Sequence, residues 1–159
     1  MLRTQVNAYM TFLGEIQQLA SRRGATLLIM GDVPRLLEEG RNCLHTDTRA
    51  QCATNRTRAF RYGWNVQPVT HPSVVYAWQL YAQTEQLMSQ FADQYVHVEY
   101  IPSSWFFNHL CDPTTGICGP TAPGTDTVIY FDTHHLTTAG SMYLAPFLNC
   151  KLRELGVLS

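Results

Sequence analysis

Asp132 and His135, three residues apart, are the side chains in this sequence with the clearest capacity for catalysis. They follow the short apolar run 127–131 and precede a segment with helical periodicity, so both are expected on one tight turn. A carboxylate that accepts a hydrogen bond from imidazole Nδ1–H fixes the tautomer and leaves Nε2 as a general base. The spacing therefore predicts the aspartate and histidine of a hydrolytic triad.

Two other interpretations of these residues compete with a triad. In the first, the aspartate caps a turn and the histidine fills a surface notch, without any chemistry. In the second, Asp132, His134 and His135 bind a metal ion. Adjacent histidines are expected to point in different directions, and the sequence offers no further ligand cluster, so we predict neither a metal nor another cofactor.

Three segments carry apolar residues at helical spacing, and three short apolar runs are typical of strands. The predicted helices cover residues 6–22, 72–93 and the segment after 137, and the predicted strands cover 25–30, 95–101 and 127–131. Helices that alternate with strands favour an α/β fold with a parallel sheet. Chemistry in such sheets gathers at the carboxyl ends of the strands, which is where Asp132 would lie.

Two long stretches, 36–68 and 103–126, are predicted as loops, and each contains a pair of cysteines close in sequence. The five cysteines are Cys43, Cys52, Cys111, Cys118 and Cys150. Short disulfides within each pair suit such loops, because a cross-link orders a segment that has no secondary structure. Five reduced thiols and a zinc site are the alternatives, although the spacings do not match zinc knuckles. The triplet Asn55-Arg56-Thr57 is an acceptor pattern for N-glycosylation.

The composition indicates one soluble globular domain. Of the 159 residues 45% are hydrophobic and 14% are charged, and the formal net charge is −1. These values exclude a disordered chain and argue against nucleic acid as a partner. No apolar run approaches the ~20 residues of a membrane span, and we expect no signal peptide within this sequence.

The segment Tyr130–Gly140 resembles the last conserved block of SGNH (GDSL-like) hydrolases. The closest resemblance is to the SGNH domains that are fused to multi-pass membrane acyltransferases and O-acylate glycans. Leu27–Pro34 is similar to the mid-domain strand of that group, which ends in a proline. The two local cysteine pairs resemble its two extracytoplasmic disulfides. These matches cover nearly the whole chain in the same order.

The resemblance implies a flavodoxin-like, three-layer α/β fold in which His135 is the catalytic base and Asp132 is its partner. His134 matches a variable position and receives no role. The resemblance also implies disulfides within the pairs Cys43/Cys52 and Cys111/Cys118. An O-acylated glycan would be the substrate, a membrane acyltransferase domain would be a partner, and the domain would be extracytoplasmic and tethered to a membrane.

This sequence departs from the family pattern because it lacks the Gly-Asp-Ser block that carries the nucleophile. Gly31-Asp32-Val33 shares the first two residues of this block, but valine has no hydroxyl and cannot attack an ester. Ser103 and Ser104, after a predicted strand, are the nearest substitutes. We therefore interpret residues 1–159 as the C-terminal portion of a single SGNH domain, an incomplete fold whose N-terminal strands are missing.

A second hypothesis belongs to another functional class. The scaffold would have lost its chemistry and would serve as an extracytoplasmic carbohydrate-binding or interaction module. The aromatic run Trp105-Phe106-Phe107 would then stack on sugar rings, unless it packs beneath the second cysteine loop.

Overall fold

The computed structural model describes residues 2–34, 36, 54–55 and 72–159. The predicted pair Cys43/Cys52 lies outside the described residues. The elements in chain order are α1 (Leu2–Arg22), β1 (Leu27–Met30), β2 (Thr54–Asn55), α4 (Pro72–Gln94), β3 (Val98–Ile101), α5 (Ser103–Leu110), β4 (Ile117–Cys118) and α6 (Thr138–Glu154). The three helices expected from periodicity are therefore all present.

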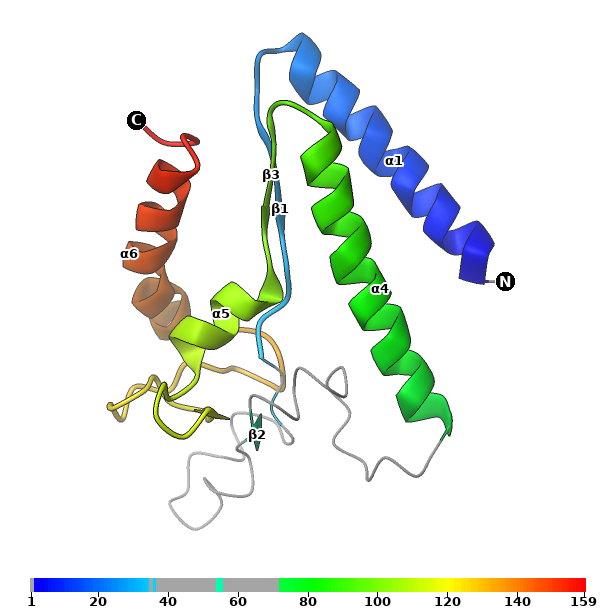
Figure 1. Ribbon diagram of the computed structural model, residues 1–159. Helices are drawn as coiled ribbons and strands as arrows, with labels where there is room; N and C mark the ends of the chain where they lie inside the picture. Colours follow the sequence, from blue (N-terminus) through cyan, green and yellow to red (C-terminus); the bar gives the residue numbers. More distant parts are fainter. Residues whose placement is uncertain (1, 35, 37–53, 56–71) are drawn as a thin grey trace.

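The strands β1 and β3 form a parallel pair, as the α/β interpretation predicts. Leu27 is opposite Val98 and Met30 is opposite Ile101. Figure 1 shows α1 and α4 on one side of this pair and α5 and α6 on the other. Three layers result, with the sheet in the middle.

Two hydrophobic clusters fill the spaces on the opposite faces of the sheet. The cluster toward α5 and α6 has as its buried members Leu36, Ile101, Phe106, Leu110, Ala122, Ile129, Tyr130 and Leu144. The cluster toward α1 and α4 consists of Leu13, Ile29, Met88, Phe91 and Val98. Neighbouring residues of β1 serve different clusters, since Leu28 packs on the first and Ile29 belongs to the second. This division explains why strand 25–30 is apolar without alternation.

The helix ends follow the expected local chemistry. Gly24 after α1 and Gly156 after α6 have φ angles of 64° and 69°, a left-handed conformation that glycine adopts without strain. Thr137 precedes α6, and its hydroxyl accepts a hydrogen bond from the Gly140 N–H. This cap fixes the start of α6 immediately after the predicted catalytic turn.

The prediction of a strand over 95–101 is wrong at its beginning, because β3 starts only at Val98. His97 has a φ of 73°, which is incompatible with an extended strand. Val96 is 80% exposed and lies in the turn that joins α4 to β3. Apolar alternation alone does not reveal this turn.

The prediction of a loop over 103–126 is wrong in its first third, where the chain forms α5. Phe106 and Phe107 are each 1% exposed. Phe107 packs with Cys111 and Cys118 beneath the second cysteine loop, whereas Phe106 belongs to the cluster toward α5 and α6. These two rings are therefore core residues and not a surface that stacks on sugars.

The predicted strand 127–131 is extended, but it does not join the β1–β3 sheet. Its backbone bonds are made locally: the Ile129 N–H donates to Pro120 O, and the Phe131 N–H donates to His135 O. Ile129 O accepts from the Thr137 N–H. These partners satisfy the backbone, and isolated bridges replace a ladder.

Cys111 and Cys118 form the disulfide expected for the second cysteine pair. β4 ends at Cys118 and pairs with β2 in antiparallel fashion. Cys150 on α6 is a free, exposed thiol. Within the described residues, no helix is both long enough and apolar enough to cross a bilayer.

Candidate active site

The segment from Asp132 to His135 is a tight turn held together by the aspartate side chain. Asp132 Oδ1 accepts hydrogen bonds from the backbone N–H of His134 at 2.9 Å and of His135 at 2.8 Å. An aspartate that bonds to the backbone two and three residues ahead stabilises a turn of this kind. The same side chain therefore builds the turn and carries the predicted chemistry.

The second oxygen of this carboxylate binds the imidazole of His135. Asp132 Oδ2 lies 2.6 Å from His135 Nδ1. An ionised carboxylate only accepts, so Nδ1 carries the proton and Nε2 carries the lone pair. No residue described by the structure hydrogen-bonds to Nε2. The His135 side chain is 66% exposed and that of Asp132 is 28% exposed, so the imidazole is accessible to a reactant.

Hydrogen bonds keep Asp132 ionised. The backbone N–H of His134, the imidazole of His135 and the backbone N–H of His135 together hold the pKa of the Asp132 carboxyl well below its usual value. A carboxylate with this character stabilises an imidazolium that forms beside it. The pair can therefore orient a base and support its positive charge.

His134 lies beside the pair and does not point away from it. Its ring centroid is 4.0 Å from that of His135, and its Nδ1 is 3.7 Å from Asp132 Oδ1. Nδ1 also lies 2.9 Å from the Thr133 hydroxyl. The expectation that the adjacent histidines diverge is thus wrong, because one donor atom from each of Asp132, His134 and His135 lies within 4.8 Å of the others.

Long-range contacts fix the turn to the rest of the fold. The Leu36 N–H, after β1, donates to Thr133 O at 2.7 Å. On the other side, the Thr137 hydroxyl donates to Val128 O at 2.9 Å. The polypeptide that follows the carboxyl end of β1 therefore contacts the turn directly. Ligands of parallel sheets usually bind beyond the carboxyl ends of the strands.

Tyr130, two residues before Asp132, is a buried polar residue that sequence patterns do not single out. It is 1% exposed, and its hydroxyl has no hydrogen-bond partner among the described residues. Burial, and then the charge of Asp32, raise the pKa of Tyr130 well above its ordinary value. Tyr130 is neutral at physiological pH and serves the core beneath the turn.

Ser103 is not an available nucleophile. It is fully buried, its Oγ donates to Glu85 Oε1 at 2.8 Å and it accepts from the Asp32 N–H at 2.8 Å. A Cβ on Gly31 would also collide with Ser103, so the two backbones are in close contact. The hydroxyl therefore connects the chain after β1 and β3 to the middle of α4 and does not face a reactant.

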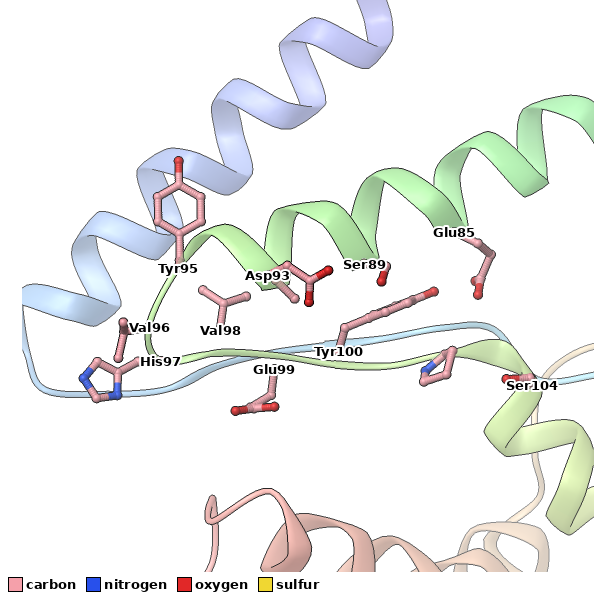
Figure 2. A pocket seen from close by; sticks show the side chains of 12 residues that line it. Glu85, Ser89, Asp93, Tyr95, Val96, His97, Val98, Glu99, Tyr100 and Ser104 are labelled. Atoms are coloured by element: carbon pink, nitrogen blue, oxygen red, sulfur yellow. The ribbon is translucent and has the colours of Figure 1, made fainter.

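A groove of about 700 Å³ lies along β3 and includes Ser104 in its lining. Figure 2 shows Glu85, Ser89 and Asp93 reaching toward β3 from α4, whereas Glu99 lies on the other side of the strand. Neither Asp132 nor His135 lines this groove. The groove and the Asp132–His135 pair are separate features of the molecule.

Neither the curated proteins nor the solved structures gave a significant match. The family model described as "SGNH domain (fused to AT3 domains)" matches residues 3–149, which is almost the whole chain. The match includes the turn with Asp132 and His135 and the pair Cys111/Cys118. This chain belongs to the family of SGNH domains that are fused to AT3 acyltransferase domains.

Proposed function

We propose that this chain supplies the aspartate and histidine of a Ser-His-Asp site that transfers or hydrolyses O-acyl groups on glycans. The hydrogen bond of 2.6 Å between Asp132 Oδ2 and His135 Nδ1 carries the proposal. It leaves the lone pair of Nε2 on an exposed ring, which is what a general base requires.

In the proposed reaction, His135 Nε2 accepts the proton of a serine hydroxyl while the serine oxygen attacks the acyl carbonyl carbon. The Nε2 proton then passes to the departing oxygen, and an acyl-serine ester remains. A sugar hydroxyl or water, deprotonated by the same Nε2, attacks the ester, and the Nε2 proton passes to the departing serine oxygen and restores the hydroxyl. Asp132 keeps the imidazole oriented and balances its positive charge in both steps.

The serine is proposed to come from polypeptide outside this sequence. Val33 has no hydroxyl. Ser103 is buried, and its hydroxyl is hydrogen-bonded to Glu85 and to the Asp32 N–H. We propose that residues 1–159, of which 3–149 match the family, are the C-terminal portion of one SGNH domain. Strands and oxyanion donors of the same domain would then precede this chain.

The family also supports an acyltransferase as the partner. Its SGNH domains are fused to AT3 domains. We propose that such a membrane domain delivers the acyl group and that this domain acts on the extracytoplasmic side. The Cys111–Cys118 disulfide agrees with that side, because disulfides persist in oxidising compartments.

The test joins this chain to the polypeptide encoded immediately upstream and measures hydrolysis of p-nitrophenyl acetate. His135→Ala is expected to lower kcat/KM by roughly 10³-fold or more, because removal of one triad member removes most triad catalysis. His97→Asn is the matched control. His97 is exposed, belongs to a distant turn, and has a left-handed backbone that asparagine tolerates.

Full activity in His135→Ala would refute the assignment of the base. The chain by itself is expected to give no covalent labelling with a fluorophosphonate probe. Labelling of a serine in the isolated chain would show that the nucleophile lies within residues 1–159 and would contradict this proposal.

A further inference from the structure

The turn that holds the Asp132–His135 pair also presents an unusual set of metal donors. Two imidazoles and one carboxylate come from Asp132, His134 and His135, and one donor atom from each lies within 4.8 Å of the others. All three belong to one turn whose backbone is fixed by two hydrogen bonds to Asp132. The donors are therefore assembled before any ion arrives.

The donor atoms lie within 4.8 Å of one another and must shift to reach the spacing of a tetrahedral zinc site. With Zn–N bonds of about 2.0–2.1 Å, tetrahedral ligand atoms lie about 3.3 Å apart. His134 Nδ1 is 3.7 Å from Asp132 Oδ1, which requires only a small approach. His135 Nδ1 is 2.6 Å from Asp132 Oδ2, a distance set by a shared proton that a metal ion would replace.

The chemistry of the donors selects the class of metal. Imidazole nitrogen with one carboxylate suits Zn²⁺ and the neighbouring transition metals, whereas Mg²⁺ and Ca²⁺ prefer oxygen ligands alone. The side chains of His134 and His135 are 40% and 66% exposed, so an ion from solvent reaches them. Three protein ligands would leave the remaining position to water.

We propose that Asp132, His134 and His135 form a zinc-binding site whose occupation switches off His135 as a base. Neutral imidazole has one proton and one lone pair. A metal on Nδ1 takes that lone pair and moves the proton to Nε2, while a metal on Nε2 occupies the base directly. Either way, no lone pair is left to accept a proton from a hydroxyl. The inhibitory part rests on the proposed function, whereas the binding part does not.

The binding part is tested by isothermal titration calorimetry of this chain with zinc chloride near neutral pH. His134→Phe keeps an aromatic ring beside His135 but removes both nitrogen donors, and His134→Ala removes the ring as well. Each is expected to weaken one zinc site by about tenfold or more. His97→Asn removes an exposed histidine outside the turn and is expected to bind zinc like the wild type. Magnesium chloride is expected to give no binding to the turn.

Circular dichroism establishes that each variant is folded before titration. Zinc binding that is identical in the wild type and both His134 variants would overturn the proposal, as would the absence of zinc binding at millimolar concentration. Equal binding of magnesium to the turn would overturn the assigned metal class.

The inhibitory part is measured in the upstream-joined protein by p-nitrophenyl acetate hydrolysis, each variant being compared with its own metal-free rate. Zinc is expected to inhibit the wild type at least tenfold more strongly than His134→Phe. Equal inhibition of both would contradict the switch. If the joined protein lacks activity, the proposed function fails, while the calorimetry still decides whether the site exists.

Discussion

At the scale of single residues, the Asp132 side chain makes three hydrogen bonds within the candidate site. One oxygen accepts two backbone N–H groups and the other binds His135 Nδ1. Because each bond favours the ionised form, the pKa of the Asp132 carboxyl is held below its usual value. The geometry of the turn and the charge that orients the histidine thus have the same origin.

This lowered pKa predicts how the turn responds to acid. Above the unfolded-state value of about 3.9, both states are ionised and the stabilisation from the turn is fully present. As the pH falls below about 4, the unfolded state binds a proton first, and the stabilisation is lost toward the folded pKa.

Asp132→Asn provides the measurement of this effect. Urea unfolding followed by tryptophan fluorescence is expected to give a wild-type advantage that is present at about pH 5 and becomes smaller as the pH falls further. An advantage that stays unchanged down to about pH 2 would contradict the hydrogen-bonded, ionised carboxylate.

At the scale of elements, the site depends on how closely α6 approaches the extended segment before the turn. A Cβ on Gly140 would overlap the carbonyl oxygen of Ile129. Glycine at this position lets the first turn of α6 pack on that backbone, while Thr137 caps the helix and bonds to Val128 O. The two ends of the turn from Asp132 to His135 are thereby held in one place.

Gly140→Ala is therefore expected to lower the free energy of unfolding by about 1–3 kcal/mol, because the methyl group must displace backbone. Gly14→Ala is the matched control. Gly14 lies inside α1 with open space around it, so alanine is expected to stabilise the protein by about 0.5–1 kcal/mol. Denaturant unfolding of both variants measures whether the free energy of unfolding falls in Gly140→Ala and rises in Gly14→Ala. A neutral or stabilising Gly140→Ala would contradict the close contact.

Sequence periodicity predicted α1, α4 and α6 well, because each has a repeated apolar stripe and two of them end before a glycine with positive φ. The short elements were harder to predict. α5 is eight residues long and rich in aromatics, so it reads as a loop, and the left-handed His97 shortens β3. Such features depend on tertiary packing more than on local propensity.

The candidate site also has a part that the sequence predicts and a part that it does not. Asp132 and His135 are near in sequence, so their spacing sufficed to predict a pair on one turn. Contacts across long separations, such as Ser103 with Glu85 and Leu36 with Thr133, have no local signal. The neighbouring position of the His134 ring also escaped prediction, because it depends on the exact turn that Asp132 imposes.

At the scale of the whole molecule, the parallel sheet is small. Only β1 and β3 pair in it among the described residues, and each has four residues. Unpaired strand edges invite further pairing, and two-stranded sheets are marginal without additional packing.

We therefore expect this chain by itself to be marginally stable or to self-associate. Size-exclusion chromatography with light scattering over a range of concentrations measures the association, and thermal unfolding measures the stability. A concentration-independent monomer with a sharp two-state transition at high temperature would contradict this expectation.

Asp132 is expected to hold His135 with its proton on Nδ1 and its lone pair on Nε2. Long-range proton–nitrogen NMR of the histidine side chains in this chain tests it directly, since it distinguishes the protonated ring nitrogen from the unprotonated one. We predict that, at a pH where the ring is neutral, His135 is protonated on Nδ1 and that Asp132→Asn abolishes this preference. A His135 ring protonated on Nε2, or one unaffected by Asp132→Asn, would contradict it.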